Sequence, residues 1–117
     1  MKNLRQIGSQ KEDLAACYLV EQGYNILERN LYSRDAEADI IAMDGEILCF
    51  VEVKFRADDS YGLAEEAITP NKIRHMIKFA RFYLMKNPQF NVFEIRFDVV
   101  AINGNDINLI KGAFDAY

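Results

Sequence analysis

The feature that most constrains this chain is Asp44-Gly45, a pair that lies between two apolar segments of alternating polarity. Asp-Gly in such a setting is a strong signal for a two-residue β-hairpin loop. If these two residues form the loop, Met43 pairs with Glu46, and the strands cover residues 38–43 and 46–55. The hairpin then sets the relative positions of the charged side chains that its strands carry.

Three acids and a lysine fall on one side of this predicted hairpin. Pairing outward from the loop places Asp39 opposite Phe50 and Glu37 opposite Glu52. Cross-strand partners point to the same face and side chains alternate along a strand, so Lys54 joins the acids. Carboxylates crowded together resist ionisation unless a counter-charge is present. A divalent cation is therefore the natural occupant of this face.

The other side of the hairpin is wholly apolar and is expected to face a core. It carries Ala38, Ile40, Ala42, Ile47, Cys49, Val51 and Val53. Two alternatives to a metal site stay open on the acidic side. The charges could keep an exposed hairpin edge in solution, or a β-bulge could shift one strand and reverse its parity.

The composition indicates one compact domain over residues 1–117, because half of the residues are hydrophobic. No apolar run approaches membrane-spanning length, and the first residues are too polar for a signal peptide. Cys17 and Cys49 lack metal-ligand spacing, and we interpret them as reduced core residues of a cytoplasmic protein. A net charge of −4 argues against nonspecific coating of nucleic acid but allows an enzyme whose acids gather at a metal.

Helices and further strands are expected around the hairpin. A first helix over residues 9–22 should end before Gly23, a typical stop. A second helix should begin at Thr69-Pro70, with Thr as cap and Pro in the first turn, and run to Lys86. The pattern predicts an α/β fold with a central mixed β-sheet flanked by α-helices. The remaining strands are expected at residues 24–30, 93–102 and 107–111.

Glu12 shares a helical stripe with Ala15 and Leu19. An acid on an apolar stripe is either a first-turn partner of the helix dipole or a functional group aimed inward, and spacing alone does not separate the two. Asp98, two positions from Arg96 on a predicted strand, could pair with Arg96 or with a helix residue, and we interpret it as structural.

Basic residues are candidates for contact with a polyanion. Arg74, Lys78 and Arg81 share the polar side of the second helix, where they form either a solvated face or a phosphate-binding one. Arg56 opens a polar loop directly beyond Lys54, and loops in that position commonly carry substrate contacts. We assign nucleic-acid binding to Arg56, Lys72, Arg74 and Lys78.

Phosphodiester hydrolysis is the chemistry that these residue types fit. Mg²⁺ held by carboxylates can neutralise the phosphate, activate water and stabilise the leaving oxygen. Mg²⁺ typically takes one or two protein carboxylates, which fits Asp39 and Glu52, and the carbonyl of Val53 could add a ligand. Lys54 can orient the attacking water, help to deprotonate it or offset charge in the transition state. The sequence has no Gly-rich phosphate loop, nucleophile elbow or Cys-x-x-Cys pair, and its one histidine, His75, is expected at the surface.

The chain also resembles the YraN-like family of small bacterial proteins, uncharacterised protein family 0102. The resemblance begins at Gly8 and Glu12 and continues through residues 23–30, 37–42, 50–56, 67–72 and 96–102. That family looks like a member of the restriction-endonuclease-like superfamily, similar to archaeal Holliday-junction resolvases. The resemblance implies that fold, with Glu12 as a helix-borne acid near the metal, Asp39 and Glu52 as principal ligands, and Lys54 as catalytic lysine.

We therefore expect a nuclease, dependent on Mg²⁺ or Mn²⁺, that hydrolyses DNA and acts on branched or processed intermediates. A homodimer is expected if it cuts both strands, and no membrane partner is expected. The alternative is a nucleic-acid-binding or scaffold domain that keeps the fold with little turnover. The acidic balance of the chain favours this alternative, whereas the intact acids and Lys54 favour the nuclease.

Overall fold

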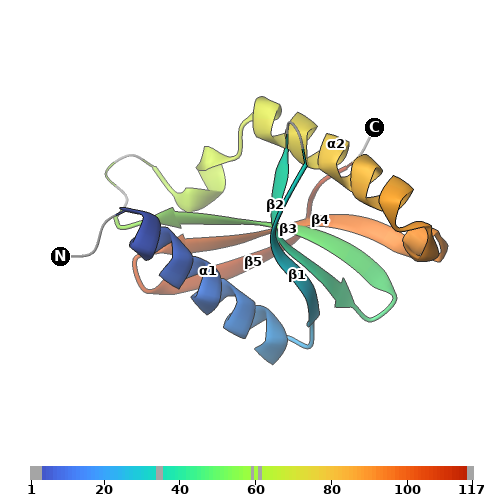
Figure 1. Ribbon diagram of the computed structural model, residues 1–117. Coiled ribbons are helices and arrows are strands. Elements are labelled where there is room, and N and C mark those ends of the chain that lie inside the picture. Colours follow the sequence, from blue (N-terminus) through green and yellow to red (C-terminus); the bar gives the residue numbers. More distant parts are fainter. Residues whose placement is uncertain (1–3, 34–35, 59, 61, 116–117) are drawn as a thin grey trace.

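The computed structural model describes residues 4–33, 36–58, 60 and 62–115. A five-stranded sheet lies between two helices, α1 (Leu4–Glu21) on one face and α2 (Pro70–Lys86) on the other (Figure 1). Two short 3₁₀ helices, η1 and η2, flank α2. The strands and 3₁₀ helices are β1 (Asn25–Tyr32), β2 (Glu37–Asp44), β3 (Ile47–Arg56), η1 (Ala64–Ala67), η2 (Pro88–Val92), β4 (Glu94–Asn103) and β5 (Asp106–Phe114).

The strands stand in the sheet in their chain order, β1-β2-β3-β4-β5. β3 and β4 run parallel, and α2 lies on the connection between them, whereas the other neighbouring strands are antiparallel. The predicted mixed sheet flanked by helices is thus confirmed. Within the described residues, no helix combines the length and apolar character needed to cross a membrane.

Both helices have sequence-encoded ends. The Thr69 hydroxyl accepts a hydrogen bond from the Lys72 backbone N–H at 3.1 Å, and Pro70 occupies the first turn, so α2 begins where the sequence predicts. α1 starts earlier than predicted. Beyond its end, Gly23 adopts φ +95° and donates its N–H to the carbonyl of Val20 at 3.0 Å.

The turn of the central hairpin differs from the prediction. Asp44 pairs with Ile47, so Gly45 and Glu46 form the loop, and the predicted pair of Met43 with Glu46 is wrong. Gly45 has φ +62°, and the described non-glycine residues with positive φ do not include Glu46. This matches a type II′ turn, which takes glycine at its first central position, rather than the type I′ turn typical of Asp-Gly.

The new register changes partners but not parity. Phe50 pairs with Ile41 instead of Asp39, and the ladder between β2 and β3 extends to Ile40 and Val51. Each residue of β3 pairs with a β2 residue two positions away from its predicted partner. Because side chains repeat every two residues along a strand, those predicted to share a face of this ladder still do so.

β2 and β3 separate beyond this ladder. β2 stays paired with β1 as far as Glu37, whereas its recorded pairing with β3 stops at Ile40. The predicted pair of Glu37 with Glu52 is therefore wrong. The two strands open into a fork at this end of the sheet, and the fork creates the candidate site.

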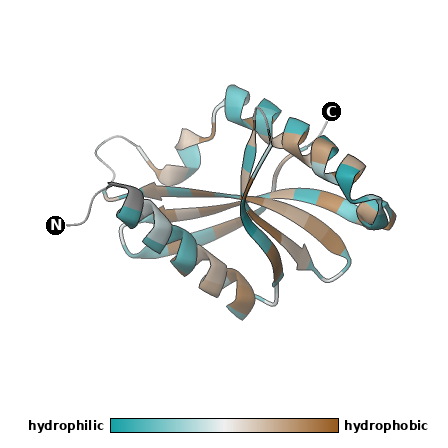
Figure 2. Ribbon diagram, viewed as in Figure 1, coloured by the Kyte–Doolittle hydropathy of each residue, from teal (hydrophilic) through white to brown (hydrophobic). Residues whose placement is uncertain are grey.

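Two large apolar clusters pack on the two faces of the sheet, and a smaller third one joins Ala64 of η1 to Val99 and Ala101 of β4. Figure 2 colours the ribbon by hydropathy, and the central strands carry many hydrophobic residues. The first large cluster contains Ala15, Ala16, Leu19, Tyr24, Ile40, Ala42, Cys49, Val51, Val100 and Ile102. The second contains Ala38, Ile41, Leu48, Phe50, Met76, Phe79, Ala80, Tyr83 and Phe97.

Two predictions about the core are wrong. Ala38 packs against α2 and not with Ile40, because β2 departs from β3 between these residues and the alternation of its side chains is interrupted there. Cys17 is exposed, since it lies off the α1 stripe formed by Ala15, Ala16 and Leu19, whereas Cys49 is buried as predicted.

Candidate functional site

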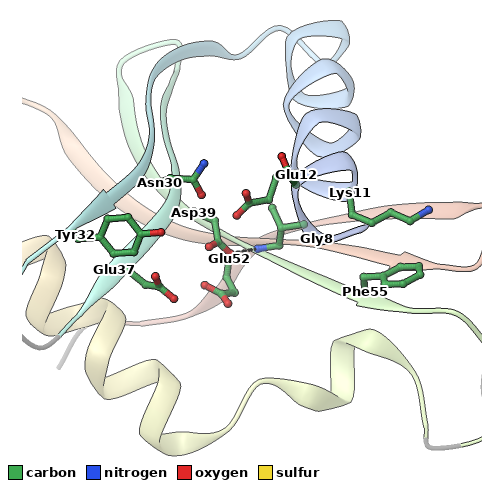
Figure 3. A pocket seen from close by; sticks show the side chains of 11 residues that line it. Gly8, Lys11, Glu12, Asn30, Tyr32, Glu37, Asp39, Glu52 and Phe55 are labelled. Carbon is green, nitrogen blue, oxygen red and sulfur yellow. Dashed lines mark hydrogen bonds between the residues drawn. The ribbon is translucent and has the colours of Figure 1, made fainter. Parts of the chain in front are cut away.

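A cavity of about 510 Å³ occupies the fork between β2 and β3. Four elements contribute to its wall. Figure 3 shows Glu12 from α1, Asn30 from β1, Asp39 from β2 and Glu52 from β3 directed toward one another. Three of the four residues predicted to be catalytic therefore line one cavity, although they are far apart in the sequence.

Asp39 lies between the two strands rather than on one face of the hairpin. Its Oδ2 accepts a hydrogen bond from the Val53 backbone N–H at 2.9 Å. This bond occupies a backbone donor that the departing strand no longer pairs. In a strand, the N–H and C=O of one residue point to the same side, so the carbonyl of Val53 is directed toward the fork as well.

Glu52 is 3% exposed and has two lysines beside it. Its Oε1 lies 3.6 Å from Lys54 Nζ, and its Oε2 lies 3.3 Å from Lys72 Nζ, which is also 3.9 Å from Glu37 Oε1. These are ion-pair distances, and Oε2 is buried without a hydrogen-bond partner. Burial and the charge of Asp39 raise the pKa of Glu52 to about 8, although Lys72 and Lys54 oppose the shift.

Glu12 brings a third acid to the cavity from α1. Burial and the neighbouring Asp39 raise the pKa of the Glu12 carboxyl. With its amide nitrogen turned toward this carboxyl, Asn30 donates to both oxygens at 2.9 Å. The charge of Arg29 lowers the pKa of Glu12 in part, and Arg29 also pairs with Asp13 at 2.6 Å, which ties α1 to β1.

Asn30 is a site residue that the sequence reasoning missed. It has φ +52° within β1, a left-handed conformation that asparagine tolerates better than most residues. Such backbone conformations cluster at functional sites because the surrounding structure must hold them in place. The available signal was its place in the stretch of residues 23–30 that carries the family resemblance, but the backbone angle itself leaves no trace in the sequence.

Of the basic residues assigned to nucleic-acid binding, Lys72 makes contacts at the candidate site. Lys72 enters the site through its ion pairs with Glu52 and Glu37. Arg56, Arg74 and Lys78 are not among the described residues that line the cavity. Arg74 donates to the side chain of Asn71 at 3.2 Å, and Nε of Arg56 is buried without a hydrogen-bond partner.

The oxygen-rich fork has the character of a site for a hard cation. Its donors are carboxylate and carbonyl oxygens, and one buried carboxylate oxygen lacks a hydrogen bond. Across the described part of the chain, no three histidine, cysteine, aspartate or glutamate side chains are grouped so that they could hold a metal ion. A cation at the fork would therefore draw further ligands from water, backbone or substrate.

Comparison with known proteins supports the family resemblance. The model of uncharacterised protein family UPF0102 matches residues 11–102. A UPF0102 protein of Lachnoclostridium phytofermentans is 47% identical over 115 residues, which cover 98% of each chain. UPF0102 proteins of Vibrio campbellii and Persephonella marina are each 45% identical and cover 92–93% of this chain and 92% of their own. The chain therefore belongs to the family UPF0102.

Proposed function

We propose that this protein is a metal-dependent nuclease that hydrolyses phosphodiester bonds in DNA. The observation that carries the proposal is the convergence of Glu12, Asp39 and Glu52 at the fork, with Lys54 Nζ 3.6 Å from Glu52. Glu52 is a buried acid with a raised pKa that lines a cavity, and such acids are typical of functional sites. Burial here leaves Glu52 Oε2 without a hydrogen bond and with Lys72 Nζ, 3.3 Å away, as its ion-pair partner, an arrangement that a ligand could complete.

The donor set fits Mg²⁺ or Mn²⁺. Asp39 and Glu52 would supply carboxylate oxygens, Val53 its carbonyl, and Glu12 an acid at the edge of the group. Mg²⁺ usually binds through one or two protein carboxylates and keeps waters or phosphate oxygens, so an incomplete protein cage suits it. When bound, the cation neutralises phosphate charge and lowers the pKa of water.

The protein's own side chains position the reacting groups. The bond from Val53 N–H to Asp39 Oδ2 fixes that carboxylate at the fork. Lys54 follows on the same strand, with 30% of its side chain exposed, so Nζ can reach a phosphate at the mouth of the cavity. There its ammonium would orient the attacking water and could give a proton to the leaving oxygen, while the proton that the water loses would go to a carboxylate. Asn30 holds the carboxylate of Glu12, which can accept a proton from the same water.

The test is cleavage of single-stranded, duplex and branched DNA, with matching RNA, in Mg²⁺ or Mn²⁺. Lys54→Ala should lower turnover by roughly two orders of magnitude or more, the usual effect of losing a positioned acid–base group. Lys54→Arg should fail too, because guanidinium does not readily release a proton. Lys86→Ala, a loss of the same charge at the far end of α2, is the matched control.

Two outcomes would count against the proposal in different ways. Equal turnover in wild type and Lys54→Ala would remove Lys54 from the reaction. A wild-type chain that cleaves none of these substrates with either cation would overturn the nuclease proposal. Binding without cleavage would then favour the nucleic-acid-binding or scaffold alternative.

A further inference from the structure

A second cavity adjoins the acidic fork. It has a volume of about 280 Å³ and is lined by Tyr32, Ser33, Ala36, Glu37, Lys72 and His75. Tyr32 and Glu37 also line the first cavity, so the two meet at the end of β1. The volume lies near the lower end of small-ligand pockets, about 300 Å³, which suits one nucleotide.

Tyr32 is the aromatic wall between the two cavities. It is 67% exposed, whereas the rings of Phe50, Phe79 and Phe97 are buried against one another or against neighbouring rings. Across the described residues, no stacked or edge-on partner is recorded for the Tyr32 ring. Figure 3 shows it beside Glu37 and Asp39, at the edge of the acidic group. The exposed Tyr32 ring therefore does not pack into the core.

The second cavity also carries a cationic side chain, that of Lys72, and the imidazole of His75. Lys72 and His75 are three positions apart on α2, so they project from the same side of the helix. Lys72 Nζ lies between the carboxylates of Glu37 and Glu52, at 3.9 and 3.3 Å. It therefore stands at the junction where a phosphate entering the fork would pass. An aromatic platform beside a positive group is the arrangement by which proteins hold single-stranded nucleic acid.

We infer that the second cavity binds one unpaired nucleotide next to the scissile phosphate, with its base stacked on Tyr32 and its phosphate against Lys72 and His75. In an intact duplex the base is stacked between its neighbours and cannot lie on a side chain without being extruded. The inference rests on the proposed nuclease function and specifies its substrate class. The substrate is nucleic acid with an unpaired nucleotide at the cleavage point.

The test is a binding measurement that requires neither metal nor turnover. All proteins carry Asp39→Asn, which lowers charge repulsion at the fork, and the buffer contains EDTA. The probes are a single-stranded oligonucleotide with one 2-aminopurine, whose fluorescence falls when it stacks, and the same strand in a duplex. Tyr32→Ala should abolish the quenching and weaken single-strand binding roughly five- to hundredfold. Tyr32→Phe should retain both.

The control is Val92→Ala, which alters another strongly exposed apolar side chain, 82% exposed, in η2. It should change neither quenching nor affinity. The inference is overturned if Tyr32→Ala leaves single-strand binding unchanged, if it weakens duplex binding equally, or if the parent does not bind the single strand. Cleavage by the chain with native Asp39 is scored separately. Quenching on Tyr32 without metal-dependent cleavage would overturn the nuclease proposal alone, whereas cleavage with no effect of Tyr32 would overturn the subsite alone.

Discussion

Asp98 and Glu52 are both buried acids on neighbouring central strands, yet one is fully hydrogen-bonded and the other is not. Asp98 Oδ1 accepts from Arg96 Nε at 2.8 Å and from the Gly112 N–H at 3.0 Å. Its Oδ2 accepts from Tyr24 Oη at 2.7 Å and from Arg96 Nη2 at 2.9 Å. Burial alone would raise the pKa of Asp98, but these hydrogen bonds outweigh it and lower the pKa.

Glu52 has the opposite balance. Two lysines lie at ion-pair distance, but Oε2 accepts no hydrogen bond, and burial with the charge of Asp39 raises the pKa to about 8. The difference shows that burial of an acid does not by itself indicate function. A buried acid whose acceptor positions are filled stabilises the fold, whereas one with an unfilled position can bind a ligand.

The largest effect on stability is expected at Asp98, the acid whose acceptor positions are all hydrogen-bonded. Asp98→Asn should lower the free energy of unfolding by about 3–5 kcal/mol, because it leaves the largely buried Arg96 without its main counter-charge. Urea unfolding at neutral pH measures the change. Asp106→Asn, at an exposed position of β5, is the control and should have little effect. A loss below about 1 kcal/mol would mean that the ion pair of Arg96 with Asp44 suffices, and the contrast with Glu52 would fail.

The next largest effect is expected on the stabilisation of the fold by a divalent cation at Asp39 and Glu52. If Mg²⁺ or Mn²⁺ binds the folded state alone, a hundredfold excess over Kd adds about 2.7 kcal/mol. Asp39→Asn should abolish most of this gain and should raise metal-free stability, because one repelling carboxylate is removed. Thermal unfolding with and without the cation measures both changes, and Asp106→Asn should keep the wild-type response. The same metal response in Asp39→Asn would exclude a ligand role for Asp39.

The sequence predicts which side chains share a strand face better than it predicts the contacts that form between elements. Alternation along β3 places Glu52 and Lys54 on one face, and this prediction survives the error in hairpin register because strand side chains repeat every two residues. The pairing of Asp98 with Arg96, one of its two expected kinds of partner and two positions away on β4, is also confirmed. Both depend on local periodicity, which the sequence carries directly.

The parts that could not be predicted depend on tertiary packing. Asp39 reaches the Val53 N–H only because β2 leaves β3 at the fork. Lys72 meets Glu52 only because α2 packs across that face of the sheet. The left-handed backbone of Asn30 is likewise set by surrounding structure rather than by its neighbours in sequence.

The free energy of unfolding should depend on pH in opposite ways through Glu52 and Asp98. Since the folded pKa of Glu52, about 8, lies above its ordinary value of 4.5, the folded state holds this proton more tightly. The resulting stability is complete below about pH 4.5 and is lost as the pH rises to about 8. Glu52→Gln should remove this pH-dependent loss of stability. Its free energy of unfolding should exceed that of the wild type by at least about 1 kcal/mol as the pH rises from about 4.5 to about 8.

Metal-free urea unfolding over this pH range measures the difference. The pKa of Asp98 is lowered, so its contribution has the opposite sign: it is present above the ordinary value of 3.8 and is lost only in more acidic solution. Parallel pH profiles for wild type and Glu52→Gln would show that Glu52 does not titrate in this range and would end the comparison.

The smallest effect is expected at Lys72, which stands beside the unfilled oxygen of Glu52 in the place of a cation. Lys72→Met keeps most of the length of the unbranched side chain but removes its charge. The pKa of Glu52 should rise further, and the free energy of unfolding near pH 8 should fall by about 0.5–1 kcal/mol, since the ion pairs lack good hydrogen-bond geometry. Lys86→Met, at the exposed end of the same helix, is the control. Mg²⁺ affinity, followed by thermal unfolding, should improve in Lys72→Met because a positive charge near the ion is removed. Weaker Mg²⁺ binding would contradict the expectation that Lys72 and the cation compete for the unfilled oxygen of Glu52.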